Sequence, residues 1–285
     1  MPLILRFSYL VTLISVLGCT SKPANYNPFA KYSKVERDSI SKTMDDFANS
    51  MSQPSEIHRL YKDSAYMLSP ENIEIKAHLT YSFKKRGDHL KAMAGLNDVV
   101  NKDIKKGSYE QLMYRAWTLI YFYRDYHGTI RDVDLINKMS KRAYNSCWGE
   151  PCGLLKGQAL YKLGKYEEAI KVFDTVLVEE KKLGFNTDHN FLVHFYKGRC
   201  FHSLNDFSNA LKSYGLVLQL DPNYTEALYQ VGLIYKSKGE NALALQNLTK
   251  AKEWLKKGKK MGEPYFERFD EVFEYQIDEA IVGLN

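Results

Sequence analysis

The sequence predicts an all-α fold in which helical hairpins stack along the chain. Three glycines, Gly157, Gly198 and Gly232, each open the same spaced pattern of small and large residues. An alanine follows each glycine after 12 residues, and a large apolar side chain follows after 16. The second and third copies lie 34 residues apart, a period typical of one helix–turn–helix unit. Because one hairpin cannot bury its apolar face alone, neighbouring copies must stack as a solenoid.

Each copy of the pattern describes two antiparallel helices in close contact. The glycine and the alanine leave room for the approach, and a large side chain fills the space around it: Phe173, Tyr214 or Leu248. The two helices are joined at a residue that readily takes left-handed dihedrals: Gly164, Asn205 or Gly239. Pro222 lacks the amide that a helix interior needs and therefore ends the second copy.

This pattern resembles the tetratricopeptide repeat (TPR) family, and the resemblance covers three repeats over residues 150–252. In the first copy Leu163-Gly164-Lys165-Tyr166 is followed by Ala169-Ile170, and the second copy closes in Asp221-Pro222-Asn223. The third copy departs from the family pattern at Asn241, where an aromatic residue is usual. The resemblance implies a right-handed α-α superhelix, the TPR solenoid, which acts as a binding scaffold.

The repeat pattern weakens on both sides of these three copies. Residues 38–149 are predicted to form degenerate TPR-like hairpins, including a copy at 71–104 and helices at Tyr109–Arg124 and Asp132–Asn145 joined around Gly128. Residues 253–285 are expected to contain a C-terminal capping helix over Pro264–Leu284. Five apolar residues favour that helix because they fall on one of its faces: Phe266, Phe269, Val272, Phe273 and Ile277.

The first 18 residues predict a lipoprotein signal peptide. Arg6 precedes an apolar run, Phe7–Leu17, which is too short for a permanent membrane span and suits the apolar region of a signal. The run ends in Val16-Leu17-Gly18-Cys19, which resembles the bacterial lipobox. That resemblance implies that Cys19 is lipidated and anchors the chain to a membrane. The alternatives are a conventional signal peptide and a short buried helix.

Residues 19–37 are predicted to be a flexible tether, because the stretch after Cys19 is polar, contains proline and shows no helical period. Thr20 is not the aspartate that keeps lipoproteins of enteric bacteria in the inner membrane. The stretch also lacks the acidic run that some bacteria use for surface export. The resemblance to lipoproteins therefore implies an outer-membrane protein that faces the periplasm.

The cysteines other than Cys19 are predicted to be structural. Cys147 and Cys152 flank a short turn and are candidates for a disulfide in an oxidising compartment. A metal site at this pair would need two further ligands nearby, and none is evident. Cys200 lies beside Gly198 inside a repeat, where a small buried residue is usual.

Charge and motifs exclude several classes of function. The net charge of +6 is gathered in lysine clusters, which suit either an acidic partner or lipid surface, or merely solvated helix ends. No nucleic-acid-binding motif is present. Between Gly157 and Gly164-Lys165 stand six residues, whereas a phosphate-binding loop has four. We therefore expect no enzyme, no cofactor and no small-molecule substrate.

In the family, the first helix of each hairpin lines a concave groove that binds partners. Carrying those positions over to this chain gives eight candidates: Gln158, Tyr161, Lys162, Phe195, Arg199, His202, Tyr229 and Lys236. Aromatic and cationic side chains together suit a peptide with apolar anchors and an acidic group. The alternative is an ordinary amphipathic helix surface. A chaperone-tail receptor is disfavoured, because Leu154, Tyr196 and Glu226 occupy three positions of the family's carboxylate clamp.

Three functions are compatible with the sequence. The first is a membrane-anchored scaffold that binds a protein or peptide partner in the bacterial cell envelope. The second is an accessory lipoprotein for glycan or nutrient uptake, as in the SusD-type family, although that family is much longer. The third resembles the BamD lipoprotein of outer-membrane assembly, an analogy of architecture alone.

Overall fold

The computed structural model describes residues 29, 31–187 and 190–284. The predicted signal peptide, the lipidation site Cys19 and the tether up to residue 28 lie outside the described residues. The chain divides into two compact units, one ending at Ile75 and the other beginning at Lys76. Among the described residues no helix is long and apolar enough to cross a bilayer.

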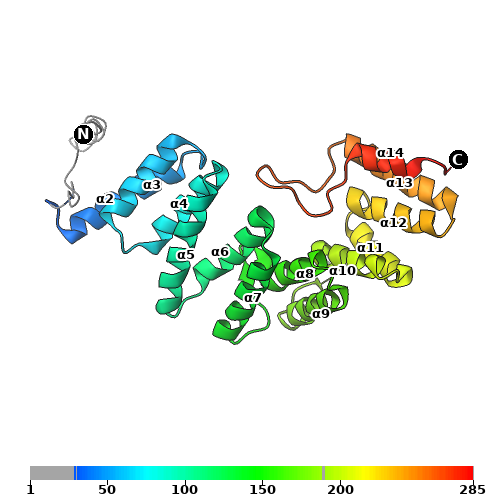
Figure 1. Ribbon diagram of the computed structural model, residues 1–285, viewed down its shortest axis with the longest axis horizontal. Helices are drawn as coiled ribbons and strands as arrows, with labels where there is room; N and C mark the ends of the chain where they lie inside the picture. Colours follow the sequence, from blue (N-terminus) through cyan, green and yellow to red (C-terminus); the bar gives the residue numbers. More distant parts are fainter. Residues whose placement is uncertain (1–28, 30, 188–189, 285) are drawn as a thin grey trace. The chain divides into compact units, whose positions relative to one another are not determined.

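The described chain is built from helices that follow one another as antiparallel pairs, coloured along the sequence in Figure 1. The helices before the turn at Ser146 are α2 (Lys34–Asn49), α3 (Glu56–Leu68), α4 (Ile73–Lys85), α5 (His89–Lys105), α6 (Glu110–Thr118), the π-helical turn η2 (Leu119–Tyr123) and α7 (Tyr126–Ser140). Two short strands, β1 (Ser146–Cys147) and β2 (Glu150–Pro151), then pair antiparallel. After them come α8 (Cys152–Lys162), α9 (Tyr166–Lys182), α10 (Phe191–Ser203), α11 (Phe207–Leu220), α12 (Thr225–Ser237), α13 (Asn241–Lys256) and α14 (Glu274–Ile281).

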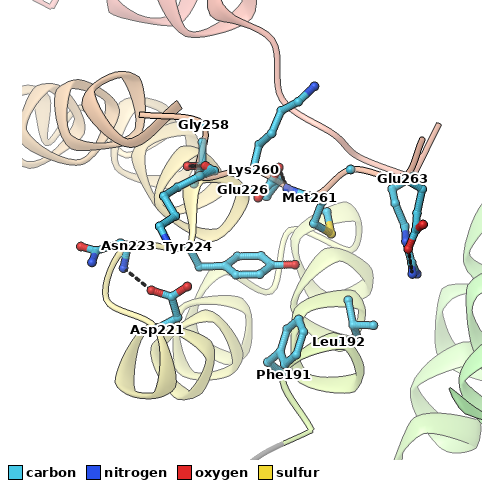
Figure 2. Close-up of a pocket in the computed structure, with 14 residues that line it drawn as sticks. Phe191, Leu192, Asp221, Asn223, Tyr224, Glu226, Gly258, Lys260, Met261 and Glu263 are labelled. Atoms are coloured by element: carbon cyan, nitrogen blue, oxygen red, sulfur yellow. Dashed lines mark hydrogen bonds and ion pairs between the residues drawn. The ribbon is translucent and has the colours of Figure 1, made fainter. Parts of the chain in front are cut away.

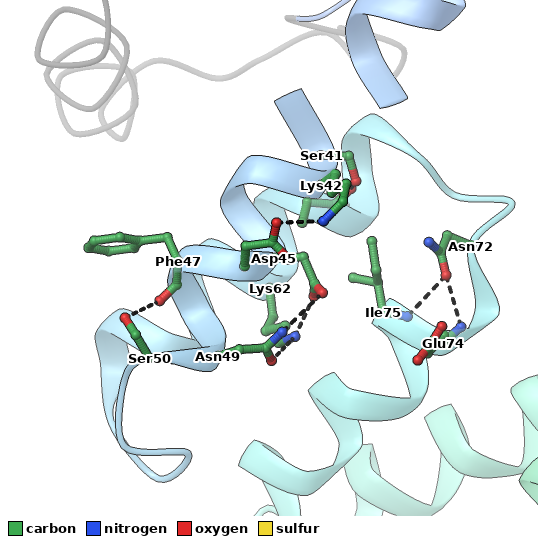
Figure 3. A network of polar contacts seen from close by, with 12 residues as sticks. Ser41, Lys42, Asp45, Phe47, Asn49, Ser50, Lys62, Asn72, Glu74 and Ile75 are labelled. Atoms are coloured by element: carbon green, nitrogen blue, oxygen red, sulfur yellow. Dashed lines mark hydrogen bonds and ion pairs between the residues drawn. The ribbon is translucent and has the colours of Figure 1, made fainter. Parts of the chain in front are cut away.

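In the first unit, α2 and α3 pack around a small apolar core formed by Phe29, Met44, Ala65, Leu68 and Ile75. Beside this core Lys62 is completely buried. Its ammonium donates to the Asp45 carboxylate and to the side-chain oxygen of Asn49 at 2.8 Å (Figure 3). The buried charge is therefore paired, which removes most of the penalty of desolvation.

The predicted tether extends too far. Helix α2 begins at Lys34, so residues 34–37 are helical. Ser33 and Glu36 cap this helix reciprocally: the Ser33 hydroxyl accepts from the Glu36 amide at 3.3 Å, and the Glu36 carboxylate accepts from the Ser33 amide at 2.8 Å. Phe29 is buried as well. The polar, proline-containing composition of this stretch does not reveal the cap.

In the second unit the three repeats form the hairpins α8–α9, α10–α11 and α12–α13. The sequence-predicted contact between glycine and large residue is present in each. A Cβ atom added to Gly198 would lie 2.6 Å from the ring of Tyr214, and one added to Gly232 would lie 2.7 Å from Leu248. Gly157 faces Phe173 in the same way. The three turn residues have positive φ angles, as predicted: Gly164, Asn205 and Gly239.

The join predicted around Gly128 is wrong. Gly128 lies inside α7, and the chain turns at Arg124, which has a φ of 53°. The Asp125 carboxylate accepts from the Gly128 amide at 2.8 Å and caps α7. Before this cap, α6 continues into the π-helical η2, which the apolar period of the sequence does not distinguish from α-helix.

The predicted capping helix over Pro264–Leu284 is also wrong in extent. Only Glu274–Ile281 is helical, and this short α14 packs against α13 through a shared apolar cluster. Residues 257–273 form neither helix nor strand; we call this segment the strap. Figure 1 draws it as a long loop that leaves α13 and returns to α14. Its apolar residues do not share one helix face but bind separate places on the preceding repeats.

The glycine contact predicts opposite effects for two substitutions to alanine. Gly198→Ala is expected to lower the free energy of unfolding by about 1–3 kcal/mol, because the new methyl group overlaps the Tyr214 ring. Gly215 lies in α11 with nothing within 4 Å of an added Cβ. Gly215→Ala should therefore stabilise the protein by about 1 kcal/mol, the difference in helix propensity. Urea denaturation measures both changes. Equal effects of the two variants would contradict the contact.

Candidate functional site

The strap lies against one face of the second unit, and we call the residues that contact it there the inner surface. They come from the end of α6, from η2 and the residue after it, from β2 and from the first helices of the three repeats: Trp117, Tyr121, Phe122, Arg124, Glu150, Tyr161, Lys162, Tyr196, Arg199, Thr225 and Glu226. The first helix of each hairpin supplies this face because its opposite side is engaged with the second helix.

An aromatic cleft near η2 holds Phe266 of the strap. The ring of Phe266 stacks on Tyr121 with centroids 5.0 Å apart. It also meets Phe122 at 5.0 Å and Trp117 edge-on at 5.6 Å. Edge-on and offset ring contacts of this kind add to the gain from burying apolar area. The cleft thus selects a flat aromatic side chain.

A buried lysine lies next to this cleft. The Lys84 ammonium lies 3.9 Å from the centre of the Phe122 ring and 4.7 Å from that of Tyr114, and it donates to the Tyr114 hydroxyl at 2.6 Å. Burial, followed by the charge of Lys85, lowers the pKa of Lys84 to about 7. The faces of these rings stabilise the ammonium through their negative quadrupoles. The lysine therefore supports the rings that receive Phe266.

A cationic node on α10 holds Asp270 of the strap. The Asp270 carboxylate accepts from the Arg199 guanidinium at 3.3 Å and from the Tyr161 hydroxyl at 3.2 Å. Arg199 also donates to the Tyr161 hydroxyl at 3.1 Å and to the Gln230 side chain. Burial alone would lower the pKa of Arg199, but the neighbouring Asp270 and Tyr161 raise it. Arg199 thus remains charged and binds a carboxylate.

Between these two anchors the inner surface binds the strap's main chain. The Tyr196 hydroxyl donates to the carbonyl oxygen of Phe269 at 3.0 Å, and Arg124 donates to that of Glu267. The ring of Phe269 lies 4.2 Å from the Arg124 guanidinium and 5.3 Å from the Lys162 ammonium. Cations over its face complement the negative ring quadrupole.

The disulfide-bonded turn contributes a further contact. Cys147 and Cys152 are bonded, with their Cα atoms 4.9 Å apart, and the turn between them carries Glu150. The Glu150 carboxylate accepts from Arg268 of the strap at 3.0 Å and lies 2.8 Å from the Tyr121 hydroxyl. Because the cross-link closes a short loop, it reduces the entropy of the unfolded chain only a little and acts mainly by fixing the geometry of this turn.

Three non-glycine residues at this site have positive φ angles. They are Arg124 with 53°, Trp148 with 55° and Asp270 with 60°. Such backbone conformations cost energy in residues with a Cβ and cluster where function requires a fixed geometry. Two of them, Arg124 and Asp270, make direct contacts between the inner surface and the strap.

The start of the strap binds α12. The Thr225 hydroxyl donates to the carbonyl oxygen of Lys259, and the Met261 amide donates to the Glu226 carboxylate at 2.8 Å. A cavity of about 320 Å³ adjoins these contacts, with the rings of Phe191 and Tyr224 meeting at 5.6 Å in its wall (Figure 2). Burial raises the pKa of Glu226 to about 7.

A second cavity, of about 370 Å³, lies between α10, α12, α14 and the end of the strap. His202, Ser203 and Tyr229 line it, together with Arg199 and Asp270. Burial and the charge of Arg199 lower the pKa of His202 to about 4, so its ring is neutral near neutral pH. This cavity is the part of the candidate groove that the strap leaves free, and its walls offer hydroxyl, imidazole and aromatic groups.

The structure separates the eight sequence-predicted groove residues. Tyr161, Lys162 and Arg199 contact the strap, while His202 and Tyr229 line the open cavity. The other three have different positions. Gln158 is buried beneath Tyr121, and Lys236 donates to the carbonyl oxygens of Ala280 and Val282 at the end of α14.

Phe195 was placed in the groove wrongly. It is fully buried, where its ring packs against Tyr214 of the partner helix and Tyr224 of the next repeat. Successive helical residues differ by about 100° in direction, so the neighbouring Tyr196 faces the strap instead. Position-by-position transfer from the family could not detect this, because aromatic residues occupy both positions.

Sequence reasoning missed the strap itself, and with it Glu150, Arg268 and Asp270. Two features of the sequence bear on it. Gly258, Gly262 and Pro264 are poor helix formers that stand before and at the start of the expected helix. Arg268 and Asp270 place opposite charges among large apolar residues. This arrangement is not typical of a helix with one apolar face and one solvated face. Neither feature alone identifies where the segment binds.

The comparisons with known proteins identify the repeat. Family models described as TPR repeat and tetratricopeptide repeat match residues 198–239 and residues 154–177 and 225–258. The chain therefore contains tetratricopeptide repeats within residues 154–258. The matched ranges coincide with the hairpins α8 to α13, which supply most of the inner surface. A search of curated protein sequences gives no significant match.

Solved structures of TPR proteins share the fold. PilF from Pseudomonas aeruginosa is similar with a TM-score of 0.60 and 15% identity, over 86% of this chain and 99% of that one. A tetratricopeptide repeat protein from Parabacteroides merdae gives 0.53 and 15%, over 91% and 85%. PilW, a type IV pilus biogenesis factor, gives 0.55 and 14%, over 74% and 88%. At such identities the similarity shows the fold alone.

The described residues contain no group of His, Cys, Asp and Glu side chains that could hold a metal ion. The chemistry that the inner surface does offer is recognition. It combines hydrogen-bond donors aimed at a peptide main chain, an aromatic cleft and a cation that binds a carboxylate.

The raised pKa of Glu226 predicts a pH-dependent stability. A carboxyl whose folded pKa is about 7 rather than 4.5 stabilises the fold at acid pH, and this contribution is lost as pH rises through 7. Between pH 5 and pH 8 the free energy of unfolding of the native chain should fall by about 1–3 kcal/mol relative to Glu226→Gln. Urea denaturation of both proteins at the two pH values measures this difference. Glu253→Gln, at an exposed position of α13, is the control. A difference that does not change with pH would show that Glu226 is not the cause.

Proposed function

We propose that this chain is a non-catalytic, lipid-anchored TPR scaffold that binds an extended segment of a partner protein in the bacterial cell envelope. The observation that carries the proposal is the inner surface, which holds a looped, non-helical polypeptide segment through main-chain hydrogen bonds and side-chain anchors. Protein or peptide binding is the general role of TPR repeats. The fold is a stack of hairpins whose first helices line one shared face, and such a face suits an elongated partner.

The envelope location rests on the sequence before the described residues. The apolar run and Gly18-Cys19 resemble a lipoprotein signal, and the following polar stretch resembles a tether. The disulfide between Cys147 and Cys152 suits an oxidising compartment such as the periplasm. Outer-membrane anchoring that faces the periplasm remains our proposal for this chain.

Blocking the open cavity tests the binding role. Ser203 is exposed at its edge, so Ser203→Trp is expected to fill the space without disturbing a packed side chain. Recovery of a co-purifying envelope protein from detergent extracts should then fall by about tenfold or more, as for a residue at the centre of an interface. Ser208→Trp, at an exposed position of α11 that does not line the cavity, is the matched control. Equal capture by native protein and both variants would overturn the assignment of this cavity to partner binding.

Replacing Cys19 tests the anchor. Native protein grown with a labelled fatty acid should incorporate the label and sediment with membranes. Cys19→Ala is expected to lose both properties, because several acyl chains on one cysteine supply the membrane affinity. Cys200→Ala removes a buried thiol within a repeat and should retain both. Label that persists in Cys19→Ala would contradict lipidation at this residue.

A further inference from the structure

The strap is longer than its connecting role requires. Helix α14 packs directly on α13, and a few residues would join two such neighbours. Residues 257–273 instead extend along the inner surface before the chain returns to α14 (Figure 1). A loop of this length without secondary structure usually has a function of its own.

Four contacts between the inner surface and the strap use main-chain atoms, which every polypeptide has. Tyr196 and Arg124 donate to strap carbonyl oxygens, Glu226 accepts from a strap amide, and Thr225 donates to a strap carbonyl. These four contacts do not depend on the strap's side chains. Another extended segment can therefore form them in its place.

The remaining contacts depend on strap side chains, of which Arg268 binds Glu150 of the disulfide-bonded turn. Three others lie against the cleft and the repeats. Phe266 fills the aromatic cleft, Phe269 lies between two cations and Asp270 binds Arg199. Together they define a pattern: an aromatic residue, a second one three positions later and an acidic residue immediately after it. The inner surface is specific at these positions.

Much of the strap is exposed between its anchors. Glu263, Pro264, Tyr265 and Glu267 are exposed, whereas Phe269 and Val272 are buried. Segments with few buried contacts open at a lower free energy than the whole fold. The strap can thus leave the inner surface while the repeats remain folded.

We propose that the strap is an exchangeable internal ligand and that the partner displaces it with a segment of the same chemistry. This inference rests on the proposed function and specifies its partner: a non-helical segment with two aromatic residues three positions apart, followed directly by an acidic residue. The strap competes at the high effective concentration of a tethered ligand, so it excludes weak competitors.

The test uses a labelled peptide with the sequence of residues 259–273. Phe266→Ala/Phe269→Ala in the full chain removes two anchors of the internal strap. The peptide is expected to bind this variant about tenfold or more tightly than it binds native protein, because the internal competitor is weakened. Fluorescence anisotropy measures the affinity. The same peptide with lysine in place of the residue corresponding to Asp270 should not bind.

The matched control removes two aromatic side chains that are largely exposed. Tyr265 and Tyr275 are 47% and 61% exposed. Tyr265→Ala/Tyr275→Ala should bind the peptide as weakly as native protein. Equal affinity in all three proteins, or no binding to the anchor variant, overturns the proposal. If the anchor variant does not fold, Asp270→Lys in the full chain weakens the strap at Arg199 and is judged by the same outcomes.

Failure of this inference differs from failure of the proposed function. If Ser203→Trp abolishes capture of an envelope protein but the anchor variant captures no more than native protein, the scaffold function stands and the exchange is wrong. If the peptide binds the anchor variant as expected but no envelope protein depends on the inner surface, the exchange stands and the proposed function is wrong.

Discussion

The close approach of two helices at a glycine is the contact on which the second unit depends. At Gly157, Gly198 and Gly232 the first helix of a hairpin comes so near the second that even a methyl group does not fit. Packing at native density transmits such a constraint to neighbouring elements. It fixes which side of the first helix is used inside the hairpin, and so which side is left to form the inner surface.

The positive charge of Arg199 limits which segments the inner surface can bind. Arg199 is held among Tyr161, Gln230 and Asp270, mostly away from water. A buried guanidinium without a carboxylate is costly, since the penalty of desolvation is no longer offset. The surface is therefore stable in two forms, one with the strap in place and one with an equivalent acidic segment. A bare form lies higher in free energy than either.

The sequence predicted the elements that depend on local periodicity and missed those that depend on distant partners. The glycine, alanine and large residue of each repeat lie within one hairpin, so their spacing alone revealed the contact. The bond between Asp270 and Tyr161 joins residues 109 positions apart, and nothing local marks it. Phe266 and Phe269 fit the face of a helix equally well, and only the presence of an aromatic cleft on η2 favours the extended form. Phe195 was misplaced for a related reason, because its role depends on which neighbour its helix meets.

The main-chain hydrogen bonds to the strap influence which substitutions this protein can accept during evolution. Substitutions at the exposed strap positions, such as Glu263 or Glu267, leave the carbonyl and amide contacts of the strap intact. A substitution of Asp270 or Arg199, in contrast, leaves the other residue of this ion pair without its counter-charge. The strap and the helices beneath it must therefore evolve as a pair, and any true partner has to follow the same changes. The strap, a segment of seventeen residues, therefore carries the side chains that we expect in the segment of the partner that replaces it.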